Sequence, residues 1–345
     1  MARMNSYRFA SLGVGVLITM FTCPDISAQT YAAGYEVLRI AEHDRPIQLD
    51  VWYPSRDGDE REHNYGLSIG RIASGADFSG NNVPVVLLSH GALGAAANYS
   101  WIAEHLARRG FLVLGVSHFG ESPVFGADTV RPESVARFDD RTRDLNAALE
   151  FLLERSRYAS RLDAERLAAI GHSSGGASVL MLAGVEFSPA LLKSYCTSSA
   201  STSDKGCEYP SSDVDAIAQT LTTTSRRLTA LVVMDPAAGP GFSDSALQTF
   251  SLPVLVIASV QNDFLPYSFH AGRVSERLPG AEVVRLDAGE GHFIYLDVCA
   301  SPIEAMGVPL CSDRPGIERA SVHGRLASII EQFLADHLGI QNAAQ

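Results

Sequence analysis

The sequence contains no run rich in lysine or arginine, although it is 345 residues long. Acidic residues outnumber basic ones by 39 to 27, and the formal net charge is −12. Nucleic acids and anionic membrane surfaces attract basic patches, so this composition argues against both as stable partners. The sequence also lacks Cys/His clusters with zinc spacing and Asp/Asn runs with calcium-loop spacing, so it predicts no metal site and no cofactor.

A long apolar run is also missing. Arg3 and Arg8 precede a run of about 15 apolar residues, which is short for a membrane span, and small residues follow it up to Ala28. This order is typical of a secretory signal peptide. We expect residues 1–28 to be removed, leaving residues 29–345 as a periplasmic or secreted protein.

Cysteine is scarce, with five residues in the chain. Loss of Cys23 with the signal segment would leave an even set of four, which favours disulfides in an exported chain. Four cysteines can pair in three ways. We favour the two local pairs, Cys196–Cys207 and Cys299–Cys311, because each pair brackets one short loop.

Hydrophobic residues make up 46% of the chain and charged residues 19%, which is enough apolar material for a sizeable core. Short continuous apolar runs alternate with amphipathic ones, which predicts parallel strands covered by helices. The expected strands are 35–40, 47–54, 83–91, 111–118, 166–173, 228–235, 253–260 and 281–287, and the expected helices are 98–109, 141–155, 174–184, 267–278 and 318–338. We expect one doubly wound, mostly parallel α/β domain.

Two segments interrupt this alternation. Residues 55–82 are polar and rich in glycine, and we interpret them as a long connection. Residues 186–227 are rich in serine and threonine, contain the Cys196–Cys207 bracket and include a helix-like piece at 214–221. This second segment lies directly after the expected helix 174–184, so we expect it to form a small lid.

The motif Gly171-His172-Ser173-Ser174-Gly175 has the form G-x-S-x-G and lies between an expected strand and an expected helix. In that context Ser173 is the candidate nucleophile on a sharp, strained turn, and side chains in place of the two flanking glycines would collide with backbone. We interpret His172 as a structural residue of the turn.

A serine hydroxyl is a poor nucleophile unless a base removes its proton. His292 follows the last expected strand within DAGEGHFIYLD, on a glycine-bracketed loop, and is the candidate base. His270 and His323 fall inside expected helices, where we expect surface positions.

Two carboxylates could orient the imidazole. Asp235 ends one expected strand and Asp263 follows the next, and both give the chain order Ser, Asp, His. We favour Asp263, because one helix and one strand separate it from His292 and their loops should be neighbours. Asp235 stays the alternative, although an aspartate before a proline also suits a turn former.

The oxyanion of an acyl-transfer intermediate needs two backbone N–H donors. Ser174, directly after the nucleophile, should supply one donor. Ala92 should supply the other, because it lies in HGALG, a small-residue turn that follows an apolar strand.

Four stretches together resemble the α/β-hydrolases, and more narrowly the dienelactone-hydrolase-like and platelet-activating-factor-acetylhydrolase-like esterases. They are PVVLLSHGALG, IGHSSGG, PVLVIASVQNDFLP and GEGHF, and the cysteine-bearing tail LDVCASPIEAMGVPLCSDRPGIERASVH is similar to that of exported members. The resemblance covers residues 35–338. It implies an eight-stranded sheet with helices on both faces and cofactor-free ester hydrolysis.

The resemblance also assigns roles. It places the nucleophile at Ser173, the base at His292 and the oxyanion donors at Ala92 and Ser174. Acetylhydrolase members have the acid at the position of Asp235, whereas many dienelactone-like members have it at the position of Asp263.

Dienelactone hydrolases proper use a cysteine nucleophile, so the serine here argues against their substrate. The expected activity is hydrolysis of a small-molecule carboxylic ester. The alternatives are amide or peptide hydrolysis on the same fold, and a non-catalytic binding protein.

Overall fold

The computed structural model describes residues 31–40, 45–208, 228–305 and 308–340. The expected signal segment and the helix-like piece at 214–221 lie outside these residues. Ten of the described strands form one sheet, in the order β10-β9-β8-β7-β5-β6-β2-β1-β4-β3. The strands are β1 (Ala32–Ile40), β2 (Ile47–Ser55), β3 (Arg61–Asn64), β4 (Ile69–Ser74), β5 (Val83–Ser89), β6 (Leu112–Ser117), β7 (Leu162–His172), β8 (Ala230–Met234), β9 (Val254–Ser259) and β10 (Glu282–Leu286).

Six neighbouring strands, from β10 to β6, run parallel to one another. β5, β6, β8 and β9 are buried along their whole length, which explains their continuous apolar sequences. β2 and β1 join the other side of this block as antiparallel strands. The mostly parallel α/β class expected from the sequence is therefore confirmed.

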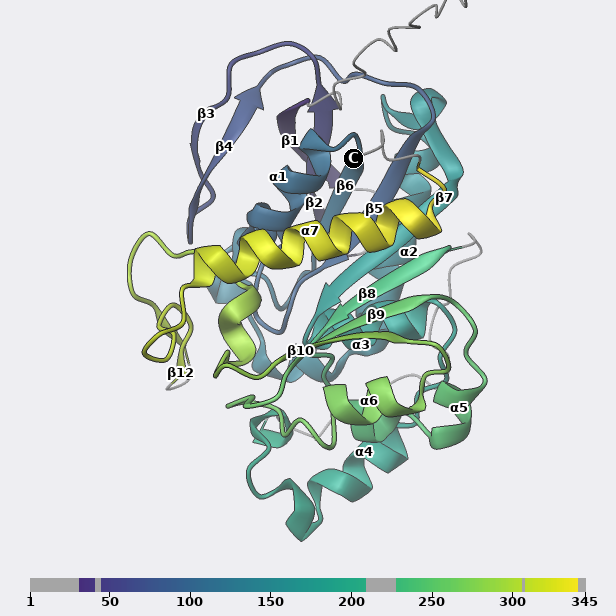
Figure 1. Ribbon diagram of the computed structural model, residues 1–345, viewed down its shortest axis with the longest axis vertical. Helices are drawn as coiled ribbons and strands as arrows, with labels where there is room; N and C mark the ends of the chain where they lie inside the picture. The colour runs from purple at the N-terminus through teal and green to yellow at the C-terminus, as the bar shows by residue number, and fades with distance from the viewer. Residues whose placement is uncertain (1–30, 41–44, 209–227, 306–307, 341–345) are drawn as a thin grey trace, which may run out of the picture.

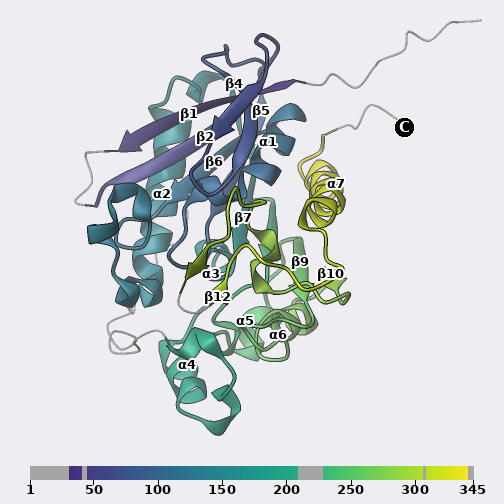
Figure 2. The ribbon, with the colours of Figure 1, turned by 90° about the vertical axis from the view of Figure 1, so that its left-hand side faces the viewer.

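Helices cover both faces of the sheet (Figures 1 and 2). α1 (Ser100–Arg108) and α7 (Arg319–His337) pack together on one face, and α2 (Phe138–Glu154) and α3 (Ser174–Leu182) pack together on the other. Three shorter helices, α4 (Pro189–Cys196), α5 (Asp244–Gln248) and α6 (Ala271–Arg277), lie at the lower end in Figure 1.

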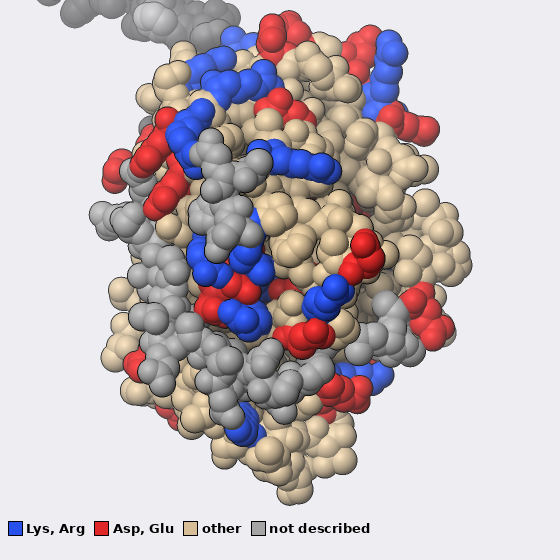
Figure 3. Space-filling model, turned by 180° about the vertical axis from the view of Figure 1, so that it is seen from behind, with Lys and Arg blue, Asp and Glu red and all other residues tan. Residues whose placement is uncertain are grey.

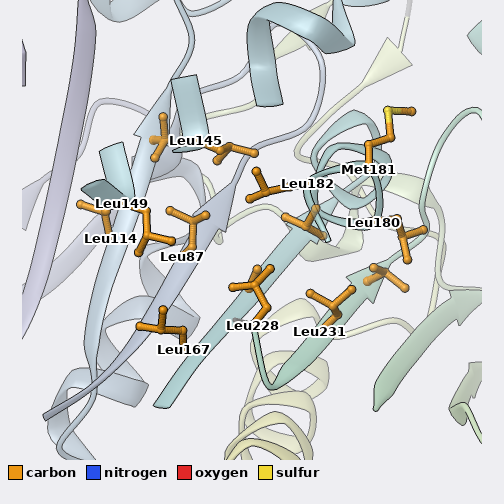
Figure 4. Packing of buried hydrophobic residues seen from close by; sticks show 14 of the residues in the cluster. Leu87, Leu114, Leu145, Leu149, Leu167, Leu180, Met181, Leu182, Leu228 and Leu231 are labelled. Atoms are coloured by element: carbon orange, nitrogen blue, oxygen red, sulfur yellow. The ribbon is translucent and has the colours of Figure 1, made fainter. Parts of the chain in front are cut away.

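The core beneath α2 and α3 is rich in leucine, as the side chains drawn in Figure 4 illustrate. Leu145 and Leu149 of α2 and Leu182 of α3 are at most 1% exposed, and they pack over Leu87 of β5 and Leu114 of β6. Truncating one such buried leucine to alanine costs about 2–5 kcal/mol of stability. This layer therefore holds α3, and with it the serine before the helix, firmly against the sheet.

From the sequence we expected the segment 55–82 to be a plain connection, but it is not. It contains β3 and β4, which extend the eight expected strands to ten. β4 pairs with β1 in parallel and β3 pairs with β4 antiparallel, so both lie at the edge beyond β1. Ligands gather at the carboxyl ends of the parallel strands in such sheets, and the turn between β3 and β4 reaches a cleft at this edge, where Tyr65, Gly66 and Leu67 line it.

The surface carries both signs of charge. Acidic and basic side chains both occur on the face seen in Figure 3. Among the described residues, opposite charges pair, for example Arg137 with Asp139 and Arg45 with Asp140. In the part of the chain that the structure describes, no helix has the length and apolar character needed to cross a membrane.

Candidate active site

Ser173 stands between the end of β7 and the start of α3. Its backbone has a φ of 56° and a ψ of −120°, a conformation that non-glycine residues rarely adopt. Strain of this kind persists only where the surroundings hold it, and it is frequent at active sites. The turn predicted from the G-x-S-x-G motif is thus present.

The two glycines of the motif are required by close backbone contacts. A Cβ at Gly171 would lie 2.2 Å from the carbonyl oxygen of Gly175, and a Cβ at Gly175 would lie 2.1 Å from that of Ser89. Both distances are far below any real contact. Glycine at these positions lets β7, α3 and the end of β5 approach one another at the nucleophile.

His292 reaches the serine from the loop after β10. Its Nε2 lies 3.0 Å from Ser173 Oγ, within hydrogen-bonding distance. Burial lowers the pKa of His292 to about 3, so the imidazole is neutral at pH 7 and able to accept a proton. Phe264 stacks on the imidazole at 5.3 Å between ring centroids and covers it from solvent.

The structure does not bring the carboxylate of Asp263 to the imidazole, contrary to the expectation from the sequence. Asp263 Oδ1 accepts a hydrogen bond of 2.9 Å from the backbone N–H of His292, and its side chain is 46% exposed. Asp235 is the carboxylate that faces the ring. Its Oδ2 lies 3.7 Å from His292 Nδ1, and its side chain is 1% exposed.

Asn262 lies between this carboxylate and the imidazole. Its amide nitrogen is 2.9 Å from Asp235 Oδ2 and 3.1 Å from His292 Nδ1. Its oxygen accepts hydrogen bonds from the backbone N–H groups of Phe264 and Leu265, which fixes the orientation of the amide. The sequence gives no sign of this contact, because an asparagine after a strand is also an ordinary turn former.

Asp235 is well supported in its buried position. The backbone N–H of Ser259 donates to its Oδ1 at 2.8 Å, and burial raises its pKa to about 8. Its own φ is 41°, a second strained backbone conformation beside Ser173. The turn at the end of β8 is therefore held so that the carboxylate points to the loop of His292.

Hydrogen bonds hold the carbonyl groups of the two peptides that contain the expected oxyanion donors. In a trans peptide the C=O and N–H groups point in opposite directions. The carbonyl of Ser173 accepts hydrogen bonds from Ala177 and Ala237, which turns the N–H of Ser174 the other way. The carbonyl of Gly91 is held by the ring of His90 at 2.6 Å and by Gly94, which likewise turns the N–H of Ala92 away from these partners, and Ala92 lines the cleft.

A buried ion pair supports the loop of Ala92. Arg141 of α2 donates to Glu121 at 2.6 and 2.7 Å and to the carbonyl oxygen of His90 at 2.9 Å. The side chains of Arg141 and Glu121 are 0% and 2% exposed. The guanidinium therefore fixes the backbone directly before the expected oxyanion donor.

His172 has the structural role that we expected. Its Nδ1 lies 2.7 Å from the hydroxyl of Tyr99, which also accepts the N–H of Gly91, and its Nε2 lies 3.0 Å from the carbonyl oxygen of His292. Tyr99 and His172 thus connect the loop of Ala92 with the loop of the base.

In the described part of the segment after α3, Leu192, Cys196 and Cys207 line the cleft beside Ser173, and both expected disulfides are present. Cys196 at the end of α4 is joined to Cys207, and Cys299 to Cys311. His270 is not on the surface as we expected, because it pairs with the buried carboxylate of Asp204 at 2.7 Å and so ties the first disulfide loop to α6.

His323 is also buried, contrary to expectation. It contacts the carbonyl oxygen of Ile294 at 2.8 Å and stacks on Trp101. No group of three or more His, Cys, Asp and Glu side chains among the described residues is arranged to hold a metal ion.

These features define a class of protein: an α/β-hydrolase with a serine on the turn after a central strand and a histidine within reach of it. Residues 80–258 match the family model described as serine aminopeptidase, S33, and the chain belongs to this family of α/β-hydrolases.

Curated relatives match part of the chain. A cutinase of Thermobifida fusca is 35% identical over 191 residues, which are 52% of this chain and 52% of that protein. Cutinase 1 of Thermobifida cellulosilytica is 35% identical over 105 residues, covering 30% of this chain and 35% of that protein. A bis(hydroxyethyl) terephthalate hydrolase of Streptomyces coelicolor is 30% identical over 115 residues, or 33% of each chain. The chain thus matches about half the length of the first relative and about a third of the others.

A solved structure shares the whole fold. The ferulic acid esterase from Streptomyces cinnamoneus has a TM-score of 0.61 and covers 93% of this chain and 94% of its own, with 18% sequence identity. At that identity the likeness establishes the fold alone.

Proposed function

We propose that the protein is an exported serine hydrolase that cleaves carboxylic esters of small molecules through an acyl-enzyme. The observation that carries the proposal is the 3.0 Å contact between Ser173 Oγ and the Nε2 of a buried, neutral His292, on a strained turn. The cutinases and the terephthalate-ester hydrolase among the relatives support an ester as the substrate.

In the proposed mechanism His292 Nε2 takes the proton of Ser173 as Oγ attacks the ester carbonyl carbon. The N–H groups of Ala92 and Ser174 hold the oxyanion. His292 then gives the proton to the departing alcohol oxygen, and water activated by the same ring hydrolyses the acyl-enzyme.

We propose Asp235, rather than Asp263, as the acid. The imidazolium formed during attack carries a hydrogen on Nδ1, and the buried carboxylate of Asp235 is the negative charge that it faces, 3.7 Å away. Such contacts are often long without substrate and tighten during the reaction. Asn262 acts as a positioning residue, because its amide holds the carboxylate at one side of the ring.

The two disulfides and the signal-like N-terminal sequence support export, to the periplasm or the medium. The description of the family as aminopeptidases keeps amide hydrolysis as the second candidate. Parallel assays with a p-nitrophenyl ester and the matching p-nitroanilide separate the two, and we expect turnover of the ester.

The decisive test is labelling of the protein with a fluorophosphonate, followed by mass-spectrometric mapping. We expect a single adduct on Ser173, and we expect Ser173→Ala to lose about 10⁶-fold in kcat while melting close to the wild type. An adduct on a different serine, or ester turnover that survives the substitution, contradicts the proposal.

A further inference from the structure

The cleft divides into two arms that meet at Ser173. The narrow arm has a cavity volume of about 70 Å³ and lies beneath α4 and the first disulfide loop. The wide arm has a volume of about 510 Å³ and reaches the hairpin of β11 (Glu304–Ala305) and β12 (Val308–Pro309). Ala92, Ser173 and Phe264 line both arms.

Only the wide arm is lined by His292, whereas only the narrow arm is lined by Ser174. In ester hydrolysis the base returns its proton to the oxygen of the departing alcohol, so this oxygen has to lie beside Nε2. The alcohol therefore extends into the arm that contains the histidine. The acyl group is attached to the other side of the carbonyl carbon, and it extends into the narrow arm.

We propose, as a refinement that rests on the proposed ester hydrolysis, that the enzyme acts on esters of a compact acyl group with a large, aromatic alcohol. A cavity needs ~10–15 Å³ to hold one water molecule, so the narrow arm accommodates only a few carbon-sized groups. The wide arm has the size of a site for a drug-sized ligand. Rings of Tyr65, Tyr99 and Phe293 line it and offer faces and edges for aromatic contacts.

The wall of the narrow arm is fixed in several ways. The disulfide Cys196–Cys207 closes the loop after α4, and both cysteines line the arm. The buried pair of Asp204 with His270, at 2.7 Å, joins this loop to α6. Widening the arm for a long acyl chain would require breaking these contacts, so the limit on acyl size is built into the fold.

Two ester series measured on the wild-type protein test the proposal. With p-nitrophenol as the constant alcohol, we expect kcat/KM to fall by about tenfold or more from butanoate to dodecanoate, because the longer chain does not fit. With butanoate as the constant acyl group, we expect kcat/KM to rise from the methyl to the benzyl to the naphthylmethyl ester. A preference for dodecanoate, with no gain from the larger alcohols, overturns the assignment of the arms.

A matched pair of substitutions tests each arm separately. Leu192 lines the narrow arm and Leu310 lines the wide arm, both are partly buried, and neither belongs to the proposed catalytic machinery. Leu192→Trp should lower kcat/KM for butanoate relative to acetate and leave the alcohol series in order. Leu310→Trp should flatten the alcohol series and spare the acyl series.

Fluorophosphonate labelling of Ser173 distinguishes a wrong assignment of the two arms from a wrong proposal of ester hydrolysis. If both variants are labelled and melt like the wild type, but the series change in the opposite pattern, the arm assignment is wrong and ester hydrolysis stands. If neither the wild type nor the variants react with the probe or any ester, the proposed function itself is wrong.

Discussion

Asp235 and Asp263 are two carboxylates beside the same histidine, and an identical substitution at each separates their roles. Asp235→Asn removes the charge that faces the imidazolium, and we expect kcat to fall by about 10⁴-fold, as for this substitution in a serine protease triad. Asp263→Asn keeps an oxygen that can accept the N–H of His292. We expect it to retain most of the activity.

Steady-state kinetics with a p-nitrophenyl ester, together with a thermal melt of each variant, are the measurements. Both variants should melt cooperatively, so that a loss of turnover is not a loss of fold. Inactive Asp263→Asn together with active Asp235→Asn would restore the assignment favoured by the sequence.

The pH dependence of kcat/KM tests the coupling between Asp235 and His292 independently. Burial lowers the pKa of His292 and raises that of Asp235, and two groups 3.7 Å apart titrate as a pair. The active form has both groups deprotonated, so activity in the wild type should rise with pH as the pair loses its last proton. In Asp235→Asn only the imidazole is left to titrate, and the rise should move to lower pH.

A pH–rate profile between pH 4 and pH 10 measures this shift. Identical midpoints in the wild type and Asp235→Asn would mean that Asp235 is not coupled to the base. Asp263→Asn should also lower the midpoint, because the charge of Asp263 raises the pKa of His292, but this carboxylate is exposed and screened by solvent, so we expect the smaller shift.

At this scale the sequence predicts that Ser173 and His292 come together, but not which carboxylate faces the imidazole. Ser173 is recognisable because a strained turn demands small neighbours at fixed spacing, and His292 because it follows the last strand of the sheet. The loops after β8 and β9 lie side by side, so the chain order suits both aspartates. The direction of each side chain decides between them, and it depends on tertiary contacts such as those of Asn262.

At the scale of elements, α2 positions the loop of Ala92 through the buried pair of Arg141 and Glu121. Removing one partner leaves an uncompensated buried charge, and we expect Glu121→Gln and Arg141→Met each to lose about 3–5 kcal/mol of stability. The double variant should lose less than the sum of the two, because neither charge is then left alone.

Urea unfolding of the four proteins of this cycle measures the coupling between the two side chains. Arg143→Met, on the same helix but 40% exposed at its side chain, is the control and should change stability little. Strict additivity of the two buried substitutions would argue against the pair as a structural unit.

The features that could not be predicted from the sequence, namely β3 and the burial of His270 and His323, have one physical cause in common. β3 consists of the polar residues REHN and is largely exposed, so no apolar periodicity marks it as a strand. Its order comes from pairing with β4, which is a tertiary property. In the same way, His270 and His323 are buried because partners from other segments satisfy their ring nitrogens, and helical periodicity carries no sign of those partners.

At the scale of the whole molecule, the two disulfides close loops at the periphery rather than crossing the core. Their sequence separations are 11 and 12 residues, and loops of this length contribute about 2–3 kcal/mol each in the chain-entropy model. Reduction should therefore lower the melting temperature but leave a folded sheet that still reacts with a fluorophosphonate.

Calorimetry with and without a reductant, and intact mass after alkylation, are the measurements. Mature protein purified after export should take up no alkylating agent until it is reduced. Four alkylated cysteines in protein that was never reduced would contradict both the disulfides and the expected export.

The strained backbone at Ser173 has a consequence for attempts to improve this protein. Three further non-glycine residues near the cleft, Leu93, Asp235 and Ala238, share its positive φ, so the site stores conformational energy that the rest of the fold sustains. Glycine at any of these four positions would relieve part of that strain. At Ser173 and Asp235 the same change also removes a proposed catalytic side chain, so a library screened for heat resistance alone would enrich inactive variants, and only a screen that also scores turnover would keep the working enzyme.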